Sequence, residues 1–107
     1  RDMAYSLTAE LIETKKLPEA VFLSNFDMAS GFYKALIKYG YVPGEDIHSV
    51  SFDRVDAMDV MNLKYDYVEH DDVQMGRVAA QMLMDHFEGR IESRREYVVP
   101  ARLIQFD

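Results

Sequence analysis

The sequence contains no cysteine, so disulfide bonds and thiolate metal sites are excluded. It also has no apolar run near the roughly 18 residues that a membrane span needs, and its beginning lacks the pattern of a secretory signal. Basic residues are few: 12 stand against 19 acidic residues, giving a formal net charge of −7. Such a surface repels the phosphate backbone of DNA. We therefore predict a soluble chain that neither enters a membrane nor binds nucleic acid itself.

What is present fits one small domain. The chain has 107 residues, of which 49% are hydrophobic, enough for a packed core. It begins with Arg1, and the first residues already have the pattern of a helix interior. We therefore expect the chain to be a fragment of a longer polypeptide.

The spacing of apolar residues predicts alternating strands and helices. We predict strands at residues 20–24, 48–52 and 67–69, helices at 2–15, 27–39 and 71–89, and extended pieces at 97–99 and 102–106. Residues 53–66 have no steady period and predict a loop with one short helix. Short apolar strands that alternate with longer helices are typical of an α/β fold, a parallel sheet flanked by helices.

Turn and cap residues support these boundaries. Gly40 is placed to end the second helix, and Pro43-Gly44 predicts a turn before the next strand. Asp71, with Gln74 three residues later, is typical of a helix start, and Gly89 predicts the end of that helix. The side expected to be buried in the long helix carries Met75, Val78, Ala79, Met82, Leu83 and His86.

Polar side chains follow all three predicted strands. These residues are Asn25 and Asp27 after the first, Asp53 and Arg54 after the second, and His70, Asp71 and Asp72 after the third. Ligands of open parallel sheets bind beyond the carboxyl ends of the strands, where a polar ligand needs hydrogen-bond partners. We therefore predict a ligand site at this edge.

Structural roles remain open for several of these residues. Asp27 and Asp71 are also placed to cap helices, and His48 and His86 suit structural roles. No metal ion or cofactor is expected, because His70 is not part of a metal-binding spacing. The sequence also has no nucleophile elbow or phosphate loop, so binding is favoured over catalysis.

Several motifs together resemble the effector domain of lactose-repressor-type (LacI/GalR) regulators. The first is Asn25-Phe26-Asp27-Met28-Ala29-Ser30-Gly31 after a short apolar strand. It is followed by Gly40-Tyr41-Val42-Pro43-Gly44-Glu45-Asp46-Ile47 and by Val50-Ser51-Phe52-Asp53. Farther along, Tyr67 to His70 with Gly76, Ala79 and Ala80, and then Pro100 to Ile104, are similar to later family motifs. The resemblance covers nearly the whole chain.

The resemblance implies a two-lobed, periplasmic-binding-protein-like fold of type I. It assigns residues 1–70 to the C-terminal lobe, residues 71–100 to a helix and strand that cross to the N-terminal lobe, and residues 101–107 to a return strand. It implies a cytoplasmic homodimer that senses a small effector, which we expect to be a carbohydrate. DNA would be bound only through an N-terminal head absent from this chain. The ligand-binding residues expected on this basis are Asn25, Phe26, Asp27, Asp53, His70 and Asp72. Met28, Phe32 and Tyr33 are expected at the dimer interface, with Phe32 or Tyr33 partly exposed for that reason.

The chain departs from the family pattern at the ligand site. Phe26 stands where sugar-binding members have an aspartate that accepts hydrogen bonds from ligand hydroxyls. A phenyl ring cannot accept these bonds in that way, but it can stack on a sugar face. His70 replaces a usual glutamine, Ser51 a usual glycine, and Gln105-Phe106 the usual terminal Arg-x-Ser.

Three other functions remain open at this point. The first is a periplasmic sugar-binding protein of a transport system, which has the same fold. The turn from Val42 to Ile47 argues against it, because this turn is similar to that of the regulators. A regulator with a degenerate effector site, acting through a protein partner, is favoured by Phe26. A metabolic enzyme is the least favoured alternative.

Overall fold

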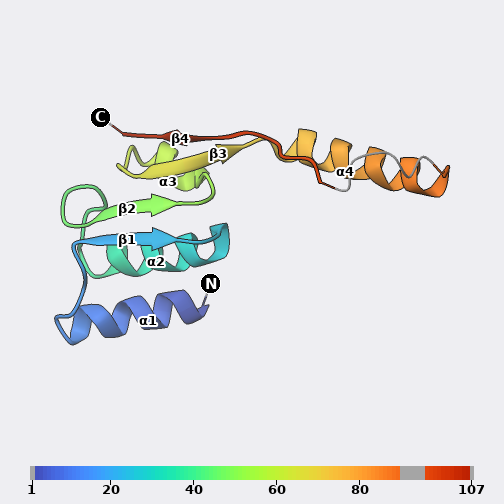
Figure 1. The fold of residues 1–107 in the computed structure, drawn as a ribbon. Helices are drawn as coiled ribbons and strands as arrows, with labels where there is room; N and C mark the ends of the chain where they lie inside the picture. The colour runs from blue at the N-terminus through green and yellow to red at the C-terminus, as the bar shows by residue number, and fades with distance from the viewer. Residues whose placement is uncertain (1, 90–95, 107) are drawn as a thin grey trace. The chain divides into compact units, whose positions relative to one another are not determined.

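The computed structural model describes residues 2–89 and 96–106, in which helices and strands alternate along most of the chain (Figure 1). The elements are α1 (Asp2–Glu13), β1 (Ala20–Leu23), α2 (Phe26–Lys38), β2 (His48–Ser51), α3 (Asp56–Val60), β3 (Asp66–His70), α4 (Asp72–Phe87) and β4 (Ala101–Ile104). Within these described ranges, no helix is long and apolar enough to cross a membrane.

The strands form one sheet in the order β1-β2-β3-β4. β1 pairs with β2 and β2 with β3, both in parallel, so that Leu23 lies opposite Ser51 and Ser51 opposite Tyr67. β4 runs in the opposite direction to β3 (Figure 1). The predicted α/β fold is confirmed, and the parallel arrangement holds for the first three strands.

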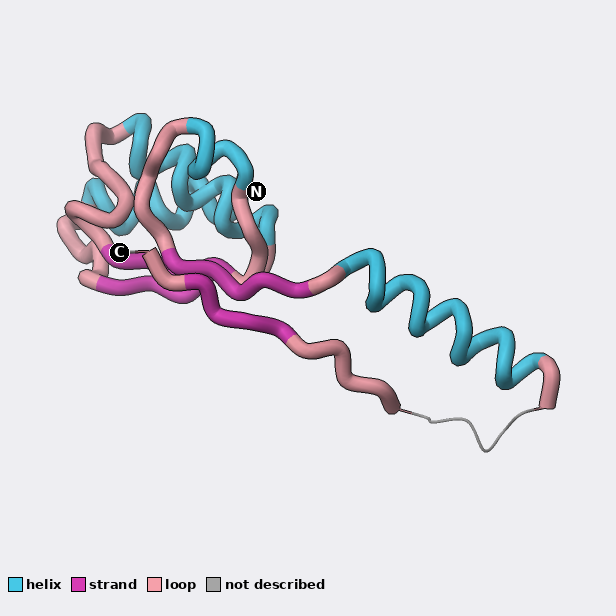
Figure 2. The backbone as a smooth tube through the Cα atoms, turned by 90° about the horizontal axis from the view of Figure 1, so that it is seen from above, coloured by secondary structure: helices cyan, strands magenta, loops and turns pink. Residues whose placement is uncertain are grey.

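The chain divides into two compact units. The first contains residues 1–69 and 103–107, and the second contains residues 70–102. In the first unit, the helices α1, α2 and α3 lie on one side of the strands (Figure 2). The assignment of the two units to the lobes of a larger domain stays a prediction.

The ends of α2 are fixed by their own residues. The side chain of Asn25 accepts a hydrogen bond of 2.9 Å from the backbone N–H of Met28, which satisfies one free donor of the first turn. At the other end, Gly40 has a φ of +84°, and the N–H of Tyr41 donates to the carbonyl of Leu36. The predicted end of this helix at Gly40 is confirmed. The cap is Asn25 rather than Asp27, so the predicted capping alternative for Asp27 is wrong.

The predicted turn at Pro43-Gly44 is also confirmed. Gly44 has a φ of +87°, and a Cβ atom added there would lie 2.3 Å from the Cβ of Lys64. The carboxylate of Asp46 accepts from the N–H of Val42 at 2.6 Å and closes the loop. Both the backbone conformation and the close approach therefore require glycine at this position.

The core of the first unit lies between α2 and the strands. Its buried residues are Leu23, Ala29, Phe32, Tyr33, Leu36, Ile47, Val55, Met58 and Tyr65. The Tyr33 hydroxyl and Ser49 Oγ are 2.7 Å apart in this core, so a strand serine gives the buried phenol a partner. Burial raises the pKa of Tyr33 to about 12. Tyr33 is therefore neutral at physiological pH.

The short helix expected within residues 53–66 is present as α3, and one tyrosine fixes its beginning. The Tyr65 hydroxyl accepts from the N–H of Val55 at 2.9 Å and donates to the Val55 carbonyl at 3.2 Å. Val55 precedes α3 and has no side-chain cap of its own. The phenol of Tyr65 thus anchors the segment at which α3 starts.

The second unit contains α4. The carboxylate of Asp71 accepts from the N–H of Gln74 at 2.9 Å, and Gly89 follows the helix with a φ of +78°, so both predicted ends are confirmed. No residue of α4 is buried, and Leu83 is 58% exposed, so the prediction of a buried side is wrong for this chain. Residues 97–99 form no strand, so the strand that the resemblance implies there is not found in the described structure.

Candidate functional site

The candidate site in the first unit lies where β1 and β2 end. Because these strands are parallel and in register, the residues that follow them meet at one edge of the sheet. Here the N–H of Phe52 donates to the carbonyl of Leu23 at 2.8 Å. Asn25 and Phe26 follow the first strand, and Asp53 follows the second. The two turns are therefore adjacent, as the sequence predicted.

Asp53 joins the two turns. One oxygen of its carboxylate, Oδ2, accepts a hydrogen bond of 2.7 Å from the backbone N–H of Phe26. The Ser51 hydroxyl donates to the Asp53 carbonyl at 2.5 Å and accepts from the Asp53 N–H at 3.2 Å. The backbone N–H of Phe26 thus orients the carboxylate of Asp53, and the Ser51 hydroxyl fixes the Asp53 backbone, before any ligand arrives. Asp53 is half-buried, so its carboxylate is held at the surface of the edge.

The other residues predicted after β1 have different settings. Asn25 uses its side-chain oxygen to cap α2, so this atom has a structural role. Asp27 lies exposed in the first turn of α2. Phe26 begins α2 and is 43% exposed, and Phe52 on the neighbouring turn is 42% exposed. The edge thus combines a fixed carboxylate with two partly exposed phenylalanines.

The predicted residues His70 and Asp72 belong to the second unit. His70 Nδ1 and Asp72 Oδ1 are 2.7 Å apart, and the His70 side chain is 17% exposed while that of Asp72 is 82% exposed. The two side chains are therefore neighbours, and their role in ligand binding stays a prediction. Within residues 2–89 and 96–106, no group of three or more His, Cys, Asp or Glu side chains is placed to hold a metal ion.

The residues predicted at the dimer interface differ in how much of their surface is exposed. Phe32 and Tyr33 are only 4% and 3% exposed and pack in the core of the first unit, so the expectation that one of them is partly exposed is wrong. Met28 is 41% exposed and accepts a hydrogen bond of 3.0 Å from the Ser24 hydroxyl to its sulfur. Of these three residues, Met28 alone presents substantial surface.

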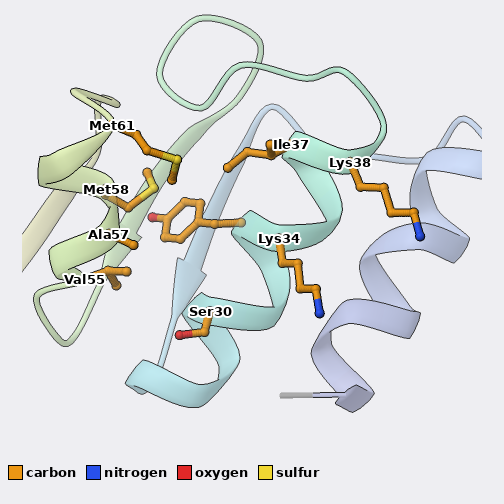
Figure 3. A pocket seen from close by; sticks show the side chains of 9 residues that line it. Ser30, Lys34, Ile37, Lys38, Val55, Ala57, Met58 and Met61 are labelled. Atoms are coloured by element: carbon orange, nitrogen blue, oxygen red, sulfur yellow. The ribbon is translucent and has the colours of Figure 1, made fainter.

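A groove of about 420 Å³ lies between α2 and α3, and its presence was not predicted from the sequence (Figure 3). It is lined by Ser30, Tyr33, Lys34, Ile37, Lys38, Val55, Ala57, Met58 and Met61. In Figure 3 Met58 on α3 and Met61, which directly follows α3, reach toward Ile37 on α2, whereas Lys34 and Lys38 point toward α1. Ile37 and Met61 are 42% and 49% exposed. The groove is therefore apolar with two lysines beside it.

A polar cluster at the opposite, amino edge of the sheet was also not predicted. Asp66 Oδ2 lies 3.2 Å from His48 Nε2, and its Oδ1 accepts from the N–H of Phe106 at 2.8 Å. Asp66 is 7% exposed, and the ammonium group of Lys64 lies 5.1 Å from the centre of the Phe106 ring. These contacts hold the end of the described chain to the start of β3, so we assign the cluster a structural role.

Comparison with known proteins matches this chain to one family. Residues 1–105 match the model of the periplasmic binding protein-like domain. The HTH-type transcriptional repressor MelR of Bacillus subtilis (strain 168) is 31% identical over 86 residues, which cover 80% of this chain and 25% of MelR. The chain thus spans about a quarter of the length of this relative.

Solved structures with a similar fold include two transcriptional regulators. The lac repressor dimer bound to operator and the anti-inducer ONPF has a TM-score of 0.78 at 20% identity, covering 95% of this chain and 35% of that one. A LacI family transcriptional regulator from Enterococcus faecium with bound ribose has a TM-score of 0.70 at 24% identity, covering 95% and 38%.

Proposed function

Because the chain belongs to the family of periplasmic binding protein-like domains, we propose that it serves as part of the effector-sensing domain of a transcriptional repressor. The predicted resemblance to LacI-type effector domains is confirmed by these comparisons. The proposed effector is a small neutral sugar. Its binding favours one arrangement of the lobes and thereby changes the affinity of a dimer for DNA.

The main support for effector binding is that the carboxylate of Asp53 is held in a fixed orientation. An ionised carboxylate accepts strong hydrogen bonds, and a sugar offers hydroxyl donors on several carbons. The N–H of Phe26 and the hydroxyl of Ser51 already orient Asp53, so a ligand need not order this residue when it binds. The chain's net charge of −7 favours a neutral ligand over an anion.

DNA binding is proposed for another part of the polypeptide. The acidic surface of this chain repels phosphates, whereas the relative MelR is an HTH-type repressor. The test is to determine the sequence that precedes Arg1 in the parent polypeptide. A helix-turn-helix of about 60 residues is the expected result. A secretory signal there would instead support a transport receptor with the same fold.

We also propose that the groove between α2 and α3 is the main contact of the homodimer. Its exposed apolar side chains, such as Ile37 and Met61, are of the kind that the buried centre of a protein interface uses. One of the similar solved structures is a dimer. Tyr33 lines this groove but is buried within its own chain, so it contributes little surface to the proposed interface.

A charge introduced into the groove tests this interface. In the full-length protein, Ile37→Asp places a charge on the proposed contact. The sedimentation coefficient should therefore fall from the value of a dimer to the value of a monomer. Val60→Asp is the matched control, since Val60 lies on α3, is 85% exposed and does not line the groove. A dimer that survives Ile37→Asp as well as Val60→Asp would place the interface elsewhere.

A further inference from the structure

The side chain of Phe26 lies outside the core of the first unit. The contact that ties this residue to Asp53 is made by its backbone N–H, which any residue except proline supplies. The phenyl ring is 43% exposed and is not among the residues that form the core or pack against it. An aromatic ring at this position therefore calls for an explanation outside the packing of the first unit.

The surroundings of the ring are those of a mixed polar and apolar surface. The bond to Asp53 Oδ2 places a carboxylate beside residue 26, and Phe52 precedes that carboxylate in the chain with 42% of its surface exposed. Sugars have hydroxyl groups around their rim and C–H groups on their faces. A carboxylate bonded to the backbone of a residue with a partly exposed aromatic ring can therefore bind the hydroxyl rim, while the ring binds a face of the same ligand.

We propose that Phe26 is a specificity-determining residue, whose ring stacks on the apolar face of the bound sugar while Asp53 accepts a hydrogen bond from an adjoining hydroxyl. This inference rests on the proposed function of the edge as an effector site. It predicts preference for a ligand with a broad apolar face, such as a hexopyranoside or an aryl glycoside, over a small sugar that is hydroxylated on all sides. A carboxylate at position 26 would favour the opposite choice.

The test is isothermal titration of the full-length protein with D-ribose, D-galactose, D-glucose and the phenyl β-glycosides of the two hexoses. For the sugar that binds most tightly, Phe26→Ala should weaken binding by about tenfold, which corresponds to one aromatic contact. Phe26→Tyr keeps the ring and should stay within about twofold of the wild type. Phe22→Ala removes another exposed ring, 61% exposed on β1, and should leave binding unchanged.

The outcomes separate this inference from the proposed function. The unfolding temperature of Phe26→Ala should equal that of the wild type, because the backbone contact to Asp53 is retained. If a sugar binds and Phe26→Ala binds it as tightly as the wild type, the role of Phe26 is overturned while the effector site stands. If no sugar of the set binds the wild-type protein, sugar sensing itself is overturned and this inference fails with it.

Discussion

Replacing Tyr33 with phenylalanine removes one hydroxyl from the interior and leaves the aromatic ring in place. The phenol lies 2.7 Å from Ser49 Oγ, and the two residues are 3% and 1% exposed. A buried hydroxyl that loses its partner costs about 1 to 3 kcal/mol. The free energy of unfolding at pH 7, measured by urea titration, should therefore fall by about that amount in Tyr33→Phe. The double variant with Ser49→Ala should be less destabilised than the sum of the single variants.

The stability of the wild type should also depend on pH in a way that Tyr33→Phe does not. Burial raises the pKa of Tyr33 from 10.0 to about 12, so the folded protein resists losing this proton. The resulting stabilisation is fully present below pH 10 and is lost as the pH rises through the folded pKa near 12. The wild type should thus lose about 2 to 3 kcal/mol more than Tyr33→Phe between neutral pH and pH 12 or above. A difference between the two proteins that stays constant over this range would refute the burial of a neutral phenol at this position.

Two other changes probe single turns by urea titration. Asn25→Ala removes the cap on the N–H of Met28 and should cost about 1 kcal/mol, so an unchanged stability would mean that the cap bond contributes nothing in solution. Gly44→Ala should cost about 2 kcal/mol or more, because its Cβ would meet Lys64 at 2.3 Å in addition to the strained φ. Gly40→Ala is the control, because Gly40 has a similar φ and an added Cβ would have no atom within 4 Å; its expected loss of stability is about 1 kcal/mol. An equal loss of stability for both glycines would contradict the predicted clash.

Local patterns allowed much of the first unit to be predicted. Gly40 and Pro43-Gly44 act through backbone conformation, which depends on a few neighbouring residues, and both were placed correctly. Short apolar runs of strand residues predicted β1 and β2, whose parallel pairing brings Asn25 and Asp53 to one edge. The adjacency of these turns follows from the topology, so the place of the candidate site could be predicted before its geometry was known.

Features that depend on packing between distant segments could not be predicted. The spacing of Phe32 and Tyr33 does not show which side of α2 meets the sheet, and both residues proved to be buried. The apolar stripe of α4 predicted a buried side, but burial also needs a partner, and α4 has no buried residue in this chain. The pairing of Asp66 with His48 and Phe106 joins segments far apart in the sequence, for which a single sequence gives no signal.

Under the proposed function, effector binding by this domain controls the binding of DNA by the full-length protein. The most direct test is the affinity of the full-length protein, measured by fluorescence anisotropy, for the DNA that it selects from a random-sequence pool. With saturating amounts of the sugar that binds in titration, the dissociation constant for this DNA should change by about fivefold or more. A sugar that binds the protein and leaves its affinity for DNA unchanged would contradict the proposed coupling.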